Sequence, residues 1–112
     1  MSVSAQCLIQ SQYIPNVATV LYTSPANTNT IIDKFTVVNA TAGSVNFSVH
    51  IVPNGDTATA ANLIVDTDTL AAHTPSDLSY MQNQILNIGD SIAVVASAAN
   101  SIVIRCSGRQ VA

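Results

Sequence analysis

The segment from residue 44 to residue 52 alternates between apolar and polar side chains, and this period of two restricts the fold more than any other feature of the chain. Successive side chains of a β-strand point to opposite faces, so the alternation predicts a strand with one buried and one solvated face. A one-residue shift in pairing would expose every apolar side chain, which specifies the register strongly. The apolar positions are Val45, Phe47, Val49 and Ile51, and the polar ones between them are Asn46, Ser48 and His50.

The low content of charged residues supports a β protein. Charged residues make up 8% of the chain, against about 25% in an average soluble domain. All six acidic residues are aspartates, and Asp disfavours helix interiors whereas Glu, Lys and Arg favour them. The scarcity of charge also suggests surfaces that pack against neighbouring molecules, because interface centres are depleted in charge. The alternative is a monomer with a neutral polar surface.

The length of 112 residues predicts one domain, residues 1–112, with one hydrophobic core. No apolar run approaches the ~18 residues of a membrane-spanning helix, so we expect no membrane partner. Residues 1–11 have neither a basic start nor a long apolar stretch, which argues against a secretory signal. We therefore expect a protein that is made and kept inside a cell, or assembled there.

Further strand signals follow along the chain and are separated by turn residues. Residues 66–70 are expected to continue the strand before them or to pair back on it. Residues 71–78 are expected to be a loop. Residues 80–86 fit either a strand or a helical turn. A short loop at residues 41–44 predicts that the strands before and after it form an antiparallel hairpin. The other predicted strands cover residues 5–13, 18–23, 30–39, 62–65, 91–97 and 102–111.

The last predicted strand carries Ile102, Ile104 and Cys106 on one face and Val103, Arg105 and Ser107 on the other. In total the sequence indicates about eight strands and little helix. We therefore predict an all-β fold, an antiparallel β-sandwich of the jelly-roll type.

No catalytic motif is recognisable in the sequence, and we expect that the protein is not an enzyme and has no catalytic residues. The two histidines are His50, on the polar face of its strand, and His73, in a loop; both are expected to lie at the surface. A nucleophilic triad needs a base, an orienting group and an oxyanion donor, and no nucleophile motif such as Gly-x-Ser-x-Gly accompanies either histidine.

Metal, cofactor and nucleic-acid sites are not indicated either. Asp66 and Asp68 suggest calcium, but without EF-hand spacing they are expected to form a solvated face. Cys7 and Cys106 lack zinc-ligand spacing; we expect two reduced, largely buried thiols, with a disulfide between the terminal strands as the alternative. Nucleic acid is not an expected partner, because phosphate recognition needs clustered Lys and Arg, and the basic residues are only Lys34, Arg105 and Arg109.

Three longer stretches carry a family resemblance as an ordered set. They are ATVLYTSPANTNTIIDKFTVVNAT (18–41), VNFSVHIVPNGDTATAANLIV (45–65) and ILNIGDSIAVVASAANSIVIRCSGRQV (85–111). Their recurring elements are Leu-Tyr-Thr-x-Pro, a strand with Ile-Ile that ends in Asn, Val-Pro-x-Gly before Thr and Ala residues, Gly-Asp-x-Ile, and a final Ser-Gly-Arg. With these elements the chain resembles a group of small virion proteins of tailed bacteriophages and prophages. It departs from them at Asp56, where the family has a second glycine, and in the more polar residues 78–84.

The resemblance implies a β-sandwich subunit of a virion, and we assign it as a capsid decoration, or cement, protein. Such a protein sits on the outside of the head and bridges shell subunits. The implied partners are the major capsid protein and other copies of the chain, with a homotrimer expected at threefold positions. The implied location is the capsid surface, after assembly in the bacterial cytoplasm. Residues 1–13 would be an N-terminal arm or an edge strand that pairs with a neighbour.

Two other functions remain open at this point. The first is another structural position in the virion, in the tail, the baseplate or a head fibre. The second is a separate carbohydrate-binding β-sandwich, which is disfavoured because the chain has no tryptophan and only 4% aromatic residues. The tyrosines Tyr13, Tyr22 and Tyr80 are expected to be packing residues.

Overall fold

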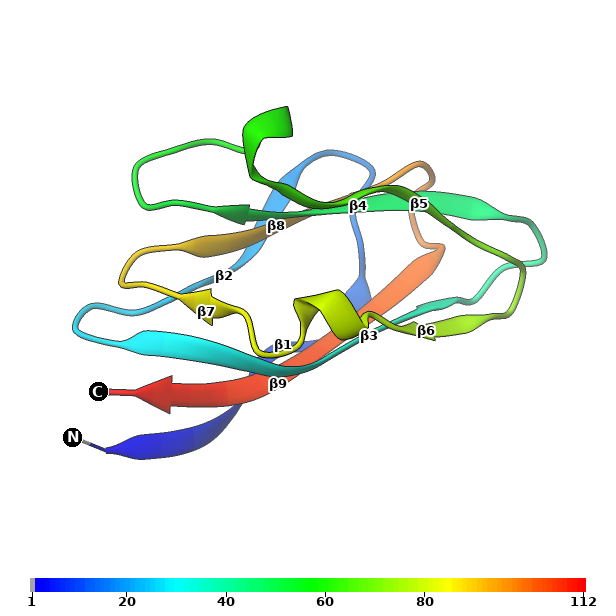
Figure 1. The fold of residues 1–112 in the computed structure, drawn as a ribbon. Helices are drawn as coiled ribbons and strands as arrows, with labels where there is room; N and C mark the ends of the chain where they lie inside the picture. The colour runs from blue at the N-terminus through cyan, green and yellow to red at the C-terminus, as the bar shows by residue number, and fades with distance from the viewer. Residues whose placement is uncertain (1) are drawn as a thin grey trace.

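The structure, a computed structural model, describes residues 2–112 and consists of β-strands with two short 3-10 turns (Figure 1). No helix within these residues is long and apolar enough to cross a membrane. The strands are β1 (Val3–Tyr13), β2 (Thr19–Thr23), β3 (Asn29–Asn39), β4 (Val45–Val52), β5 (Leu63–Leu70), β6 (Pro75–Asp77), β7 (Ile85–Leu86), β8 (Ser91–Ala96) and β9 (Ile102–Val111). The 3-10 turns are η1 (Ala60–Asn62) and η2 (Ser79–Met81).

The strands form two antiparallel sheets that pack face to face. The five-stranded sheet has the order β1-β9-β3-β6, with β7 also paired to β3, and the four-stranded sheet has the order β2-β8-β4-β5. Chain segments alternate between the two layers, as in a jelly roll. The predicted all-β antiparallel sandwich is therefore confirmed.

The core fills the space between the sheets and is formed by the face that the alternation predicted. In β4, Val45, Phe47 and Val49 are buried, while Ile51 is partly buried at the end of the strand. In β9, Ile102, Ile104 and Cys106 are buried and their neighbours on the strand point outward. The remaining large buried side chains come from both sheets and include Ile9, Ile32, Phe35, Leu78, Met81, Leu86 and Ile92.

The predicted hairpin between residues 30–39 and 44–52 is wrong, because β3 and β4 belong to different sheets. β3 pairs with β9, β6 and β7, whereas β4 pairs with β8 and β5. The short connection between them is an arch that crosses from one layer to the other. Each strand has one strongly apolar face, and placing the two strands in opposite layers turns those faces toward each other across the core.

A buried asparagine holds this arch. The Asn39 side chain is fully buried, and its Nδ2 donates hydrogen bonds to the carbonyl oxygens of Gly43 (2.7 Å) and Leu70 (3.0 Å). Its Oδ1 accepts hydrogen bonds from the backbone nitrogen (2.9 Å) and the hydroxyl (2.7 Å) of Thr41. The amide thus satisfies backbone groups that the arch leaves without sheet partners.

Replacing Asn39 with Ala is expected to lower the free energy of unfolding by about 2–4 kcal/mol, because four hydrogen bonds are lost, among them the bonds of the Asn39 amide to the Leu70 carbonyl oxygen and the Thr41 N–H. Urea denaturation followed by circular dichroism measures this change. The matched control is Asn29→Ala, at the exposed opposite end of the same strand, with an expected change below about 0.5 kcal/mol. Equal effects of the two substitutions would contradict the role assigned to Asn39.

The segment between β5 and β8 is more structured than its sequence indicated. Residues 71–78, expected to be a loop, contain β6, which pairs with Thr36–Val38 of β3. Residues 80–86 contain both alternatives, since η2 ends at Met81 and β7 follows at Ile85. Between β6 and β7, the backbone of Ile32 bonds to Asn83 (2.6 Å) and Gln84 (2.9 Å). Hydrogen bonds to β3 therefore hold most of residues 75–86 in an ordered conformation, although the sequence of this segment has only weak strand propensity.

Candidate interaction surface

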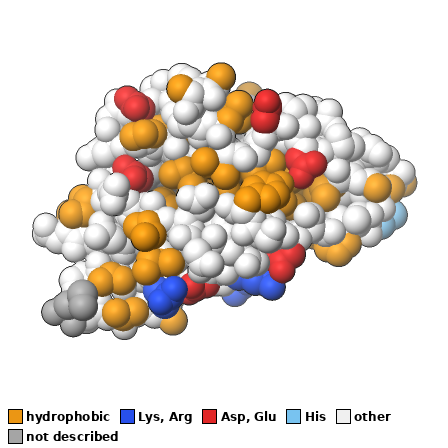
Figure 2. All heavy atoms as spheres, viewed as in Figure 1, with side chains coloured by type: hydrophobic (Ala, Val, Ile, Leu, Met, Phe, Trp, Pro, Cys, Tyr) orange, Lys and Arg blue, Asp and Glu red, His pale blue; other side chains and the backbone are white. Residues whose placement is uncertain are grey.

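All three basic residues lie on the outer face of the five-stranded sheet. Arg105 and Arg109 alternate with the buried residues of β9, and Lys34 comes from the neighbouring strand β3. We call this surface the cationic face. Figure 2 shows the blue Lys and Arg side chains gathered along the lower border of the molecule, where Figure 1 places β9 and β3.

Two of these cations are paired with aspartates on the same sheet. Arg109 donates to Asp33 through Nε (3.0 and 3.1 Å) and Nη2 (2.9 Å), and the Lys34 ammonium lies 2.7 Å from Asp77. The hydrogen bonds to the Asp33 carboxylate, and then its charge, raise the pKa of the Arg109 guanidinium. Arg105 is exposed and forms no ion pair within residues 2–112, so its guanidinium is available to a partner.

The acidic residues outside these pairs lie elsewhere. Asp66 and Asp68 belong to β5, at the edge of the four-stranded sheet, and Asp56 and Asp90 lie in the connections before β5 and β8. Burial, and then the nearby Asp68 carboxylate that its hydroxyl contacts at 3.2 Å, raise the pKa of Tyr80. The cationic face thus has a small excess of positive charge in a molecule with a net charge of −3, as the red side chains over the upper layer of Figure 2 illustrate.

Apolar side chains surround the cations on this face. Tyr13 of β1 lies opposite Val103 of β9, which lies opposite Val38 of β3, and they form one row at one end of the sheet. Tyr13 is 48% exposed, and at the other end Val3 and Ile85 are 58% and 60% exposed. Exposed apolar side chains also occur elsewhere, at Val17, Val20, Tyr80 and Ile88, so what distinguishes this face is that they accompany all three cations.

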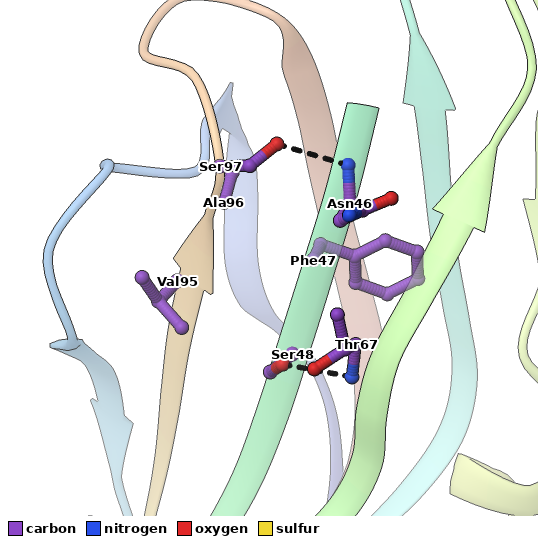
Figure 3. Close-up of a pocket in the computed structure, with 7 residues that line it drawn as sticks. All are labelled: Asn46, Phe47, Ser48, Thr67, Val95, Ala96 and Ser97. Carbon is purple, nitrogen blue, oxygen red and sulfur yellow. Dashed lines mark hydrogen bonds between the residues drawn. The ribbon is translucent and has the colours of Figure 1, made fainter. Parts of the chain in front are cut away.

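A second surface feature is a hollow of about 210 Å³ on the four-stranded sheet (Figure 3). It lies between β5, β4 and β8 and is lined by Asn46, Phe47, Ser48, Thr67, Val95, Ala96 and Ser97. The backbone nitrogen of Asn46 donates to the Ser97 hydroxyl (3.0 Å), and that of Thr67 donates to the Ser48 hydroxyl (2.9 Å). These hydroxyls hold β8 and β5 to β4, which is a structural role, and we assign no site to the hollow.

The histidines are separated, and one of them is not where the sequence placed it. His50 points away from the core as expected but is only 8% exposed, which corrects the prediction of a surface histidine. The connection from β4 to β5 folds over it, and its Nδ1 lies 3.0 Å from the carbonyl oxygen of Thr59 and 2.9 Å from Oδ1 of Asn62. His73 is exposed in the turn before β6, as the sequence predicted. The two share no site.

The cysteines also differ from the prediction of two buried thiols. Cys106 is buried, whereas Cys7 is exposed on edge strand β1, and both are free. Burial raises the pKa of the Cys106 thiol to about 12, with smaller contributions from Cys7 and Asp33. Within residues 2–112 no group of three or more His, Cys, Asp or Glu side chains could hold a metal ion.

The tyrosines only partly fulfil the packing role expected of them. Tyr22 is partly buried, and its hydroxyl contacts Thr30 Oγ1 (2.8 Å) and accepts a hydrogen bond from Gln110 Nε2 (2.8 Å). Tyr13 and Tyr80 are each 48% exposed, so about half of each side chain remains available for contacts with another molecule.

Sequence reasoning placed Arg105 outward but missed the cationic face as a unit. The period of two also puts Arg109 on the face of Arg105, because the residues are four positions apart in one strand. Lys34 joins them only because β3 pairs with β9, which sequence alternation does not reveal.

No family model matches the sequence, and no curated protein matches it. Among solved structures, the chain is similar to a chain of the Bacillus endospore appendages, a family of disulfide-linked pili, with a TM-score of 0.56 and 13% identity over 97% of this chain and 87% of that one. It is also similar to chains of infectious bursal disease virus strains Gt and Gx, with TM-scores of 0.54 and 0.52 and identities of 12% and 13%, over 97% of this chain. It spans about one third of those viral chains, 32% and 31%. At these identities the similarity establishes a shared fold.

Proposed function

We propose that this protein is a structural subunit that acts by assembly, and specifically a decoration protein on the outside of a tailed-bacteriophage head. The observation that carries the proposal is the cationic face, where every basic side chain of the chain lies on one sheet among exposed apolar groups. The sequence resemblance to small phage virion proteins supports a virion as the assembly. The fold shared with chains from a virus and from a pilus is consistent with a non-enzymatic structural role.

The physical basis of stabilisation would be repeated, selective binding. A ligand that binds the assembled shell and not its free subunits stabilises the shell by mass action. Individual contacts near ~1,000 Å² suffice when they are repeated over a symmetric particle. The partner would be the major capsid protein, with the cationic face as the contact surface and copies of the decoration protein associated with one another.

Binding to heads is the direct test. Purified protein is mixed with parent-phage heads that lack it, the heads are sedimented, and the bound protein is quantified. We expect saturable binding at a fixed number of copies per shell subunit, together with greater resistance of the heads to heat. Saturable binding to tails or baseplates, with none to heads, would replace the proposal with the alternative structural position in the virion.

The variant Arg105→Gln tests the cationic face itself. Losing the unpaired guanidinium is expected to weaken head binding by roughly tenfold, which corresponds to about 1.4 kcal/mol, without changing the melting temperature. The control, Asp66→Asn, neutralises an exposed charge on the other sheet and is expected to leave binding within about twofold. Head binding that tolerates Arg105→Gln but not Asp66→Asn would move the contact to the four-stranded sheet.

A further inference from the structure

The sheet edges differ in how well they are protected against pairing with another strand. Exposed edges are usually blunted by short length, proline, charge or local distortion. β6 has three residues and begins with Pro75, β7 has two residues, and β2 has a register shift between Val20 and Tyr22. β5 carries Asp66 and Asp68 on either side of Thr67, which has a φ of 50°. Each of these edges therefore has at least one protective feature.

The remaining edge, β1, has none of these features along its first half. The strand is eleven residues long, contains no charged residue and no proline, and lies at the end of the order of its sheet (Figure 1). Residues 3–7 are all exposed, and their register with β9 is regular. Register shifts occur only beyond Cys7. The segment Val3–Cys7 is thus a straight, neutral and accessible edge.

The backbone groups that face outward on this edge follow from the ladder. Ser2 exchanges two hydrogen bonds with Ala112, from Ser2 N to Ala112 O (2.8 Å) and from Ala112 N to Ser2 O (2.9 Å). Hydrogen-bonded and non-hydrogen-bonded pairs alternate along antiparallel strands. With the observed register, the N–H and C=O groups of Val3, Ala5 and Cys7 therefore point away from β9 toward the free edge.

We propose that β1 pairs antiparallel with β1 of a second copy, about a twofold axis at Ala5. Ala5 then lies opposite the partner's Ala5, and Val3 lies opposite Cys7 of the partner subunit. All three outward-facing residues form hydrogen-bonded pairs, which gives about six new backbone hydrogen bonds at two per pair. The two five-stranded sheets become one continuous sheet across the axis.

A second copy fits this edge for three reasons. The straight segment is centred on Ala5, so a twofold partner matches it from end to end. The segment carries no charge, so two copies do not repel each other. The other sheet edges are protected against pairing with another strand, which leaves β1 of a second copy as the matching edge. The arrangement is isologous and closes as a dimer, without propagating into fibres.

The inference deepens the self-association proposed above and specifies its surface and symmetry. A twofold dimer differs from the trimer that the sequence resemblance implied. It is tested on the purified protein alone, so its failure is separate from a failure of head binding.

The first experiment is sedimentation equilibrium over a range of protein concentrations under reducing conditions. We expect a monomer–dimer equilibrium between 11.6 kDa and twice that mass. The variant Ala5→Pro removes one outward-facing N–H and leaves the bonds to β9 in place, so it should weaken dimerisation at least tenfold while retaining the native circular dichroism spectrum. The matched control Ala5→Val keeps the N–H and should dimerise at least as well as the unmodified protein.

A second experiment tests the register and does not depend on the proline variant folding. Opposite residues of a hydrogen-bonded antiparallel pair have Cα atoms ~5.5 Å apart, within the usual range for a disulfide. The variant Val3→Cys should therefore cross-link to Cys7 of the partner subunit on mild oxidation, giving a covalent dimer that Val3→Ser and the double variant Val3→Cys, Cys7→Ser do not form. A monomer at every concentration, a trimer, or a folded Ala5→Pro variant that dimerises normally would overturn the proposal.

Discussion

Replacing Phe47 with Asp is expected to abolish the cooperative thermal unfolding transition. Phe47 is 1% exposed and lies between the two sheets, near the start of β4. Truncating a buried Phe costs about 3–5 kcal/mol, and a carboxylate in its place adds the cost of burying an unpartnered polar or charged group. The sum is comparable to the ~5–15 kcal/mol that stabilises a typical domain.

Scanning calorimetry and the near-ultraviolet circular dichroism spectrum measure this loss. The matched control is Asn46→Asp, which introduces a carboxylate one residue away on the outer face of the same strand. There the Asn46 side-chain oxygen accepts a hydrogen bond from Thr69 Oγ1 (2.7 Å), and a carboxylate oxygen retains that role. An unchanged melting curve for Phe47→Asp would contradict the assignment of β4 as a core strand.

Replacing Gly108 with Ala is expected to lower the free energy of unfolding by about 3 kcal/mol or more, at or above the upper end of the usual range for overpacking. A Cβ atom at this position would overlap the carbonyl oxygen of Ile31 and lie 2.9 Å from Leu8 Cδ1. Gly108 pairs with Ile32 beside an irregularity in the β3–β9 ladder, where β3 approaches closely. Because the nearest atom belongs to the backbone of an adjacent strand, relief requires the central ladder of the sheet to move.

Gly43→Ala is the control for this substitution. No atom lies within 4 Å of a Cβ built at Gly43, in the arch between β3 and β4. Adding a methyl group there also reduces the entropy of the unfolded chain, so a change within about 1 kcal/mol is expected. Urea denaturation compares both variants with the unmodified protein. Equal stabilities for the two variants would show that the close approach at Gly108 does not constrain the fold.

The two proposed interactions use adjoining parts of one sheet. β1 borders β9, which carries Arg105 and Arg109, so pairing of β1 edges would place the cationic faces of two copies on one continuous surface. Such a dimer would present twice the contact area to a shell. Head binding by Ala5→Pro therefore measures how much affinity comes from this bivalence, since linked sites bind more tightly than single ones.

Local pattern was sufficient to identify most strands of this protein. The alternation in β4 and β9 correctly placed Phe47, Ile104 and Cys106 inside and Arg105 outside, because the direction of a side chain in a strand depends only on its position along that strand. The absence of Glu and the scarcity of charge pointed to the all-β class. The count of about eight predicted strands with little helix indicated a two-sheet antiparallel sandwich.

The choice of partner strands was not available from local pattern. β3 and β4 look like a hairpin in sequence, yet Asn39 and its four hydrogen bonds turn the chain into the opposite layer. His50 occupies an outward position but is covered because residues 59–62 fold back over it. Cys7 lies opposite Ser107 on the outer face of the five-stranded sheet and is therefore exposed, whereas Leu8 and Ile9 on the same edge strand are buried.

The sequence alone therefore determined most of the strands, though not β6 and β7, and which face of each long strand is apolar, because both depend on the two-residue period of a single strand. Only the tertiary structure decided which strands are neighbours, and with that the cationic face, the close approach at Gly108 and the free edge of β1. These features arise where residues far apart in sequence meet, as Lys34 meets Arg105 and Arg109 across the pairing of β3 with β9. Pairing of this kind depends on the packing of the whole chain, and the two-residue alternation within one strand carries no information about it.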